Sequence, residues 1–443
     1  MPAPTESAVV AKLTRRLIPF LFLLYIVAYV DRINVGFAKL QMSAQLHFSE
    51  DVYGLAAGIF FAGYFAFQVP SNLILRRVGA RRWIALLMIV WGTISASMML
   101  VTTARGFYVL RFLLGLAEAG FFPGMIFYLR SWFPATARAR TVALFMTAAA
   151  LSGVVGGVVS GSILTLEHTG GLAGWQWLFL LEGLPAILLG VVVYFRLPDS
   201  PADAKWLTEE DRAWLSKTLS HEDEASLSLA RPSIQPASGS PSESSLAFLV
   251  LNILLLSLIY FCLNTCSYGI SLWLPSMVKN LSNASNFRVG IISALPYIAA
   301  AIGMVLVGRH SDRTGERRWH VALPAFAGAA AFLAAAYSTS TVVVVAALSV
   351  AVLGTFSMLG PFWAMPTSLL TTATASAGIA IINSIGNLGG FAGPYILGLT
   401  RAANGNFKSG LLVLAAAIMG CAIFALLVKA PVRSSVYGTQ PPS

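Results

Sequence analysis

The chain has 443 residues, of which 57% are apolar and only 11% are charged, and its formal net charge is +11. Soluble domains carry about 25% charged residues, so this chain has too few charges to cover two or three soluble domains. The basic residues stand in short clusters between apolar segments, which argues against nucleic-acid binding and favours a membrane protein in contact with the lipid bilayer.

Apolar segments of about 20 residues, the length needed to cross a bilayer, recur along the whole chain. In order, they are residues 17–40, 52–75, 83–103, 107–132, 141–166, 175–197, 246–278, 289–309, 320–337, 342–370, 375–400 and 411–428. The first is too long for a cleavable signal peptide, and we expect it to remain as the first helix. The sequence therefore predicts an all-α membrane protein with twelve transmembrane helices.

The distribution of lysine and arginine predicts the orientation of the chain. Most of these residues, such as Arg15, Arg76 and Arg313, fall in loops on the same side as the amino terminus, and few, such as Lys39 and Arg401, fall on the other side. Positively charged loops stay in the cytoplasm. We therefore expect both termini to be cytoplasmic.

A long polar stretch, residues 198–245, separates the sixth span from the seventh. Inside it, Thr208 and Asp211 form a capping pattern before apolar residues at helical spacing, which predicts a short surface helix within a flexible cytoplasmic linker. The resulting domains are an amino-terminal six-helix bundle, the linker, a carboxy-terminal six-helix bundle and a cytoplasmic tail, at residues 1–197, 198–245, 246–430 and 431–443. In transporters built from two such halves, the substrate site lies near the bilayer midplane between them.

Five charged side chains lie away from the ends of the predicted spans: Asp31, Arg32, Arg111, Glu118 and Glu182. A charge at membrane depth costs a few kcal/mol, so such residues usually line a binding cavity or an ion path. Arginine presents a fork of donors that suits a carboxylate, and carboxylic acids in a low dielectric can exchange protons. The set favours an anion transporter coupled to protons, with structural ion pairs between the amino-terminal helices as the alternative.

Spacing refines these roles. Arg111 and Glu118 are seven residues apart, about 10 Å along one helix face, which is too far for a direct ion pair. Asp31 and Arg32 are adjacent and cannot point the same way, so we expect Arg32 toward a central cavity and Asp31 toward neighbouring helices or a water path. For Glu182, a pair that holds helices together near the outer face is a better expectation than a proton path.

Residues 308–318 resemble the Gly-x-x-x-Asp-Arg-x-Gly-x-Arg-Arg loop signature of the major facilitator superfamily, and residues 72–82 resemble a weaker copy. The resemblance implies two six-helix bundles in the major facilitator fold. It also implies an inward gate held by this loop, and the gating residues would be Gly308, Asp312, Arg313, Gly315 and Arg317. The alternative is that these residues act only as topology signals.

Four further runs, at residues 29–36, 111–120, 360–367 and 383–390, resemble the anion:cation symporter family. Bacterial members of that family carry sugar acids, tartrate, phthalate, hydroxyphenylacetate and nicotinate. The resemblance implies that Arg32 and Arg111 engage the substrate carboxylate and that Asp31 and Glu118 take up and release protons. The other implied substrate-binding residues line the cavity and are Tyr29, Tyr64, Trp363, Asn383 and Asn387.

The resemblance makes the fifth span informative about the substrate, because sugar-acid carriers of that family tend to place a polar side chain in the cavity from this helix. Its residues 147–151 offer only the hydroxyl of Thr147, and the Gly- and Ala-rich residues 148–161 predict close helix packing. Few cavity hydroxyls suit an aromatic or weakly hydroxylated acid. The alternatives are a sugar acid (hexonate or hexarate) or tartrate carried with protons, and sodium-coupled or exchange transport of an organic anion.

Enzyme activity is not expected. The five histidines, at positions 47, 168, 221, 310 and 320, lie in loops or at span ends and form no metal-ligand motif or nucleophile–base pair. We therefore expect no cofactor and no metal. The resemblance favours a monomer in the bacterial inner membrane.

Overall fold

The computed structural model describes residues 6–230, 243–370 and 372–428, and over these ranges the regular structure is entirely helical. The first helices are α1 (Glu6–Ile33), α2 (Val35–Gln45), α3 (Glu50–Val78), α4 (Ala80–Ser97), α5 (Ala104–Glu118), α6 (Phe121–Arg130), α7 (Ala135–Met146), α8 (Ala148–Ile163), α9 (Gly174–Arg196) and α10 (Glu209–Ala230). The later ones are α11 (Glu243–Ser282), α12 (Asn286–Thr314), α13 (Arg318–Tyr337), α14 (Thr341–Ser357), α15 (Leu359–Leu369), α16 (Thr372–Asn404) and α17 (Lys408–Leu427). The all-helical prediction is confirmed.

Within the described ranges, 11 helical segments are long and apolar enough to cross a membrane. Some join consecutive helices, as Glu6–Gln45 joins α1 to α2. Large apolar side chains such as Val342 (78% exposed) point outward, where only lipid would cover them. The predicted span at 375–400 falls on α16, which is not among the 11 and carries asparagines and many glycines. The count of twelve therefore stays a prediction.

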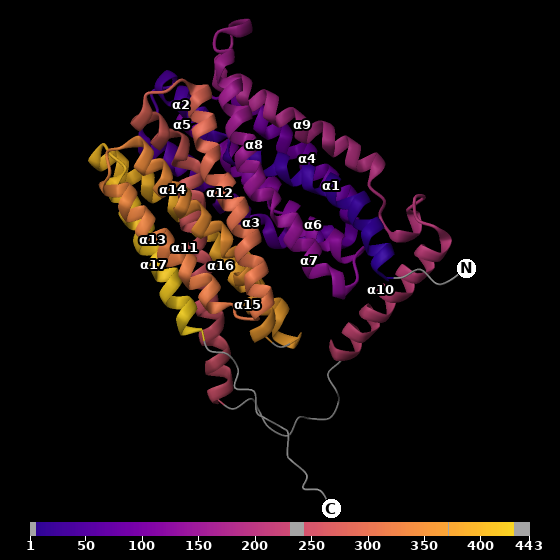
Figure 1. Cartoon of the computed structure of the whole chain (residues 1–443). Coiled ribbons are helices and arrows are strands. Elements are labelled where there is room, and N and C mark those ends of the chain that lie inside the picture. Colours follow the sequence, from indigo (N-terminus) through magenta and orange to yellow (C-terminus); the bar gives the residue numbers. More distant parts are fainter. Residues whose placement is uncertain (1–5, 231–242, 371, 429–443) are drawn as a thin grey trace, which may run out of the picture.

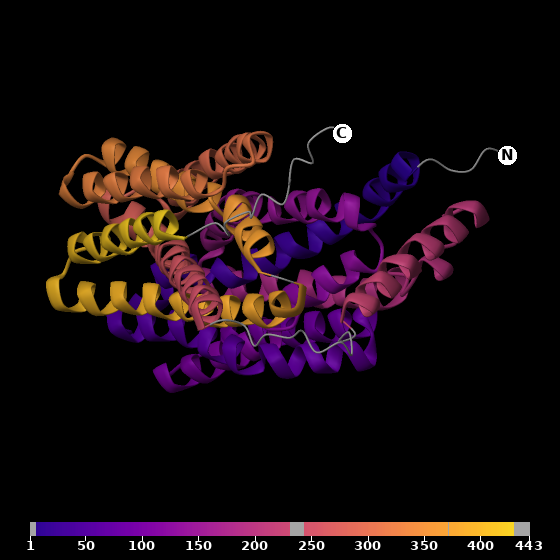
Figure 2. The same cartoon turned by 90° about the horizontal axis from the view of Figure 1, so that it is seen from below.

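The helices fall into two groups, seen side by side in Figure 1 and from below in Figure 2. In the first half of the chain, α4 packs on α9, α3 on α5, and α1 on α8. In the second half, α11 packs on α16 and α17, and α13 on α14 and α17. The groups meet through α3 with α16, α8 with α12, and α2 with α11. The boundaries of the predicted domains stay predictions.

Small residues let the two groups approach closely. An added Cβ at Gly54 would lie 2.8 Å from the Cα of Gly398, and one at Gly157 would lie 2.8 Å from the carbonyl oxygen of Gly290. In membranes, helix association depends on this kind of backbone approach because lipid is as apolar as the side chains. The structure thus agrees with close packing of residues 148–161.

Polar contacts reinforce one end of this interface, near the label α2 in Figure 1. Glu50 pairs with Lys39 at 2.8 Å and, across the interface, with Arg401 at 3.1 Å. The Tyr53 hydroxyl donates to the carbonyl oxygen of Leu272 at 2.7 Å. The two groups are therefore closed against each other at this end.

The surface helix in the predicted linker is longer than expected. The capping pattern forms, since the Asp211 amide donates to the Thr208 hydroxyl at 3.2 Å, but α10 then runs to Ala230 instead of ending near residue 215. Lys12 pairs with Asp211 at 2.7 Å and fixes the helix to α1. The remaining linker residues 231–242, and the predicted tail at 431–443, lie outside the described residues.

Candidate functional site

A buried ion pair joins α1 to α5. The Arg32 Nη2 and Nε atoms donate to Oε2 of Glu118 at 2.7 and 3.0 Å. Arg32 is 7% exposed and Glu118 is fully buried. Such a pair repays the cost of burying two charges only through good hydrogen-bond geometry, and removal of either partner leaves an uncompensated charge. Arg32 therefore has a carboxylate partner before any substrate binds.

The second half of the chain reaches the same guanidinium. Nη1 of Arg32 donates to the Tyr268 hydroxyl on α11 at 3.2 Å. The rings of Phe60 and Tyr64 on α3 each lie 5.4 Å from its central carbon, close enough for cation–π attraction. Arg32 thus lies at the junction of both halves, surrounded by aromatic rings.

Arg111 also contacts the Phe60 ring. Its central guanidinium carbon lies 4.9 Å from the ring centroid, and the residue is fully buried. Its Nε donates to the carbonyl oxygen of Ala56 at 3.2 Å, while Nη1 and Nη2 have no hydrogen-bond partner among the described residues. The structure does not pair Arg111 with Glu118, in agreement with the spacing argument. Its two unused donors are compatible with the predicted role in anion attraction.

Asp31 points away from Arg32, as predicted, into the helices of the first half. Its Oδ1 accepts hydrogen bonds from the Ser95 hydroxyl on α4 and, at 3.1 Å, from the Asn34 amide. Its Oδ2 has no donor among the described residues, and the side chain is fully buried. Asp31 and Glu118 therefore belong to different polar groups.

Glu182 on α9 links two helices, in agreement with the expected pair that holds helices together. Its Oε1 accepts a hydrogen bond from the Ser160 hydroxyl on α8 at 2.7 Å. No cationic partner of Glu182 occurs in the described parts of the chain, so the pair is a hydrogen bond to a neutral serine.

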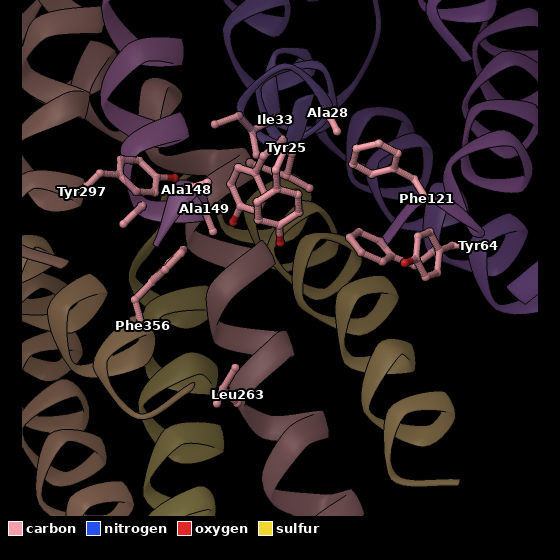
Figure 3. Close-up of a cluster of buried hydrophobic side chains, with 14 of the residues drawn as sticks. Tyr25, Ala28, Ile33, Tyr64, Phe121, Ala148, Ala149, Leu263, Tyr297 and Phe356 are labelled. Carbon is pink, nitrogen blue, oxygen red and sulfur yellow. The ribbon is translucent and has the colours of Figure 1, made fainter. Parts of the chain in front are cut away.

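The predicted cavity residues surround this junction only in part. Tyr29 lies on the buried side of α1 and contacts Tyr25, and Trp363 contacts Tyr260 with ring centroids 5.0 Å apart. Asn387 donates to Gln68 across the interface at 3.4 Å, whereas Asn383, one turn earlier on α16, is half-buried. Figure 3 shows buried side chains from both halves in this region, including Tyr25, Tyr64, Tyr297 and Phe356.

Several contacting residues were missed or underrated from the sequence. Tyr268 is one of several polar residues in an apolar stretch of α11, and another, Asn264, donates to the carbonyl oxygen of Gly386 within the second half. Phe60, Ser95 and Gln68 gave no signal, because an aromatic or single polar residue in an apolar helix is common. Only the fold brings Phe60 and Ser95 to the charged side chains, and Gln68 to Asn387.

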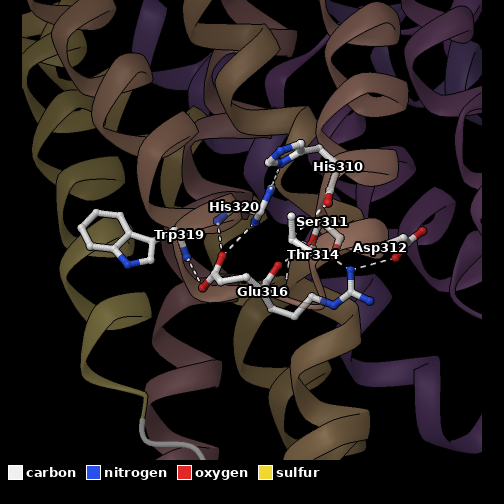
Figure 4. A network of polar contacts seen from close by, with 8 residues as sticks. His310, Ser311, Asp312, Thr314, Glu316, Trp319 and His320 are labelled. Atoms are coloured by element: carbon white, nitrogen blue, oxygen red, sulfur yellow. Dashed lines mark hydrogen bonds and ion pairs between the residues drawn. The ribbon is translucent and has the colours of Figure 1, made fainter.

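The predicted gating loop forms a compact polar network at the end of α12 (Figure 4). Gly315 caps α12 with φ +69°, a conformation that favours glycine, and Arg317 bonds both Ser311 and Asp312 at 2.8 Å. Gly308 instead lies inside the helix with open space around it, so it is not needed for a tight turn. Arg313 occupies the last turn of α12.

Beside it, His320 contacts both His310 (Nε2 to Nδ1, 2.6 Å) and Glu316 (Nδ1 to Oε2, 2.8 Å). Partial burial raises the pKa of Glu316, but hydrogen bonds from the Trp319 amide and from His320 outweigh it, so the pKa lies below its usual value. Glu316 is thus an ionised cap for the first turn of α13.

Comparison with known proteins identifies the family of the chain. Residues 21–394 match the model of the Major Facilitator Superfamily. The chain belongs to that superfamily. It is 48% identical over 424 residues to a candidate tartrate transporter of Agrobacterium vitis, covering 96% of this chain and 92% of that protein. It is 41% identical over 436 residues to the candidate metabolite transport protein NicT of Pseudomonas putida, covering 96% and 95%.

Among solved structures, the inward open conformation of the xylose transporter XylE from E. coli superposes with a TM-score of 0.72 at 16% identity, covering 95% of this chain and 97% of that one. At this identity the likeness shows the fold alone. Fold and family agree that the protein is a multi-pass membrane transporter of the major facilitator type and not an enzyme.

Proposed function

We propose that this transporter imports a small organic carboxylate together with protons across the bacterial inner membrane. The observation that carries the proposal is the Arg32–Glu118 pair, which is buried, lies beside Tyr268 of the second half, and offers the substrate an arginine already suited to a carboxylate. The bacterial relatives named for tartrate and metabolite transport support an organic anion as cargo.

Coupling follows from competition for one guanidinium. While Glu118 is ionised, it occupies Nε and Nη2 of Arg32. A proton on Glu118 removes its charge and leaves Arg32 without a counterion at membrane depth, so an incoming carboxylate takes its place. When the anion leaves, Glu118 gives up its proton and restores the pair. Arg111 adds a fixed positive charge beside the same Phe60 ring.

Transport by alternating access requires the two halves, 1–197 and 246–430, to open at each end in turn. The closed end is held by glycine contacts and by few polar ones, chiefly Glu50–Arg401 and Tyr53 to Leu272. With both termini cytoplasmic, this end faces outward. The loop of Asp312, Arg313, Gly315 and Arg317 would steady the opposite, inward end.

For the substrate, we favour an aromatic or weakly hydroxylated acid. The Thr147 hydroxyl donates to the carbonyl oxygen of Leu144 in its own helix, and aromatic rings dominate around Arg32. Tartrate, a dicarboxylate with two hydroxyls, is the second candidate because the 48% identical relative is named for it.

The test uses purified protein in proteoliposomes under an imposed pH gradient, with labelled hydroxyphenylacetate, tartrate and a hexonate in separate assays. We expect concentrative uptake of at least one acid, dependent on the pH gradient and unchanged when sodium is replaced by potassium. Uptake that follows sodium, or that exchanges anions without the gradient, contradicts proton coupling. Strong competition by a hexonate or hexarate, with none by aromatic acids, contradicts the preferred substrate class.

A further inference from the structure

Glu182 is a buried acid that the proposed transport cycle does not use. It is 5% exposed, and only the Ser160 hydroxyl donates to it within the described chain. Its second oxygen, Oε2, has no hydrogen-bond donor there. Since an ionised carboxylate at membrane depth needs a cation or several donors, Glu182 is poorly stabilised as an anion.

Asn34 lies at the junction of α1 and α2 and contacts Asp31. Its amide donates to Asp31 at 3.1 Å, and both α1 and α2 pack against α9, the helix that carries Glu182. Asp31 and Glu182 also act on each other electrostatically. With Ser95 and Ser160, these residues make one buried group drawn from α1, α4, α8 and α9, which we name the acid cluster. Asn34 itself is 1% exposed.

The charges around the acid cluster do not neutralise it. Glu118 on α5 is a further acid that acts on Asp31, and its partner Arg32 is hydrogen-bonded to Glu118. Arg111 on α5 interacts electrostatically with Asp31 but makes no hydrogen bond to it. Two carboxylates that share a buried site without a cation between them cannot both be ionised cheaply, so the pair retains a proton.

Buried oxygens without hydrogen-bond donors also favour a bound proton in the acid cluster. Three buried oxygens in the cluster lack a donor among the described residues: Asp31 Oδ2, Asn34 Oδ1 and Glu182 Oε2. Ionised carboxylates only accept, so they cannot satisfy the amide oxygen, whereas a protonated acid supplies one O–H donor. A bound proton therefore satisfies atoms that the deprotonated cluster leaves without partners.

We propose that Glu182 shares with Asp31 a proton-binding site in the first half, separate from Glu118, and that Glu182 is a positioning residue for the proton coupling that the family resemblance assigns to Asp31. The coupling role rests on the proposed proton-linked transport. The proton-binding pair itself does not, and can be tested without any substrate.

The substrate-free test is infrared spectroscopy of the protein reconstituted in lipid, following the carbonyl band of protonated carboxylic acids as pH is raised. We expect the wild-type band to persist above the range of exposed acids and to fall in two steps. Glu182→Gln and Asp31→Asn should each remove one step, while the control Glu210→Gln, exposed on α10, leaves both. An unchanged titration in Glu182→Gln overturns the proton-binding pair.

The coupling role is tested by the pH dependence of uptake in proteoliposomes, with tartrate or hydroxyphenylacetate as the probe. Glu182→Gln removes a like charge beside Asp31 and should move the pH midpoint down by about one unit. Ser160→Ala keeps the acid but removes its donor, and should move the midpoint up by less. A lower maximal rate with unmoved midpoints in both variants overturns the coupling role.

Failure of the proton-binding pair and failure of the proposed function can be told apart. If the wild-type protein accumulates no acid under a pH gradient, the proposed function fails, yet the infrared titration still decides the pair. Should Glu182→Gln unfold in detergent, the Ser160→Ala midpoint, together with the Asp31→Asn infrared steps, gives the same decision.

Discussion

The two halves of the molecule differ in where they place charge. The first half has five charged side chains away from the ends of its predicted spans, whereas in the described spans of the second half Asp, Glu, Lys and Arg stand only near the helix ends. The second half contributes neutral groups instead, with Tyr268 as its contact to Arg32. Under the proposed function, the first half would bind charge and protons, and the second half would recognise the uncharged part of the substrate.

The largest effect is expected from removing the arginine at the junction of the two halves. Arg32→Ala removes the only guanidinium that contacts both Glu118 and Tyr268 among the described residues. We expect substrate affinity to fall roughly a hundredfold, about 3 kcal/mol, because the buried carboxylate of the substrate loses its cationic partner. Binding can be measured by thermal shift over a series of organic acids, with Arg32→Lys as the control that keeps the charge but not the fork. Retained affinity in Arg32→Ala would assign the anion site elsewhere.

A second variant separates the halves at their closed end. Gly54→Val places side-chain atoms against Gly398 and should cost about 1–3 kcal/mol as overpacking. Because the clash exists only while this end is closed, we expect spin-label distances across the end to lengthen. Gly308→Ala is the matched control, since an added Cβ there meets no atom within 4 Å. Equal distances in both variants would show that the glycine contact does not hold the end closed.

Tyr268→Phe measures how much the second half contributes to substrate affinity through its contact with Arg32. The variant keeps the ring, which packs 4.3 Å from that of Phe61, and removes only the hydroxyl that accepts from Arg32. A hydrogen bond to a charged group contributes about 1.5–3 kcal/mol, so affinity should fall by roughly tenfold or somewhat more. The measurement is the same thermal-shift series. An unchanged affinity would remove Tyr268 from the site.

The smallest expected effect on stability concerns the loop after α12. Asp312→Asn removes an ion pair to Arg317 whose acid is 74% exposed, so thermal unfolding should change by less than about 1 kcal/mol. If the loop steadies the inward gate, the uptake rate still falls. Unchanged uptake, with unchanged stability, would reduce the pair to a surface contact.

The sequence predicted which charged residues lie at membrane depth. It also predicted that Asp31 and Arg32 point in different directions, because neighbouring residues on a helix point about 100° apart. It could not predict that Arg32 pairs with Glu118, which is 86 residues away, or that Tyr268 joins them from 236 residues away. Such partners depend on how the helices pack, and many polar residues fit a helix equally well.

The linker prediction was wrong in one part. The stretch after residue 215 is rich in serine and acids, a composition typical of linkers, yet α10 continues to Ala230. For Glu182, a pair between helices could be expected from the sequence, but its partner Ser160 could not be identified, because only the packing of α8 on α9 brings the two side chains together.

The most direct test of the account measures proton and substrate movement together in Glu118→Gln. In proteoliposomes carrying a pH-sensitive dye, wild-type protein should move protons inward with the acid and accumulate it. Glu118→Gln, which is uncharged like the protonated acid, should still exchange labelled for unlabelled substrate but neither accumulate it nor move protons. Accumulation by Glu118→Gln with the wild-type pH dependence would contradict the competition of Glu118 and substrate for Arg32.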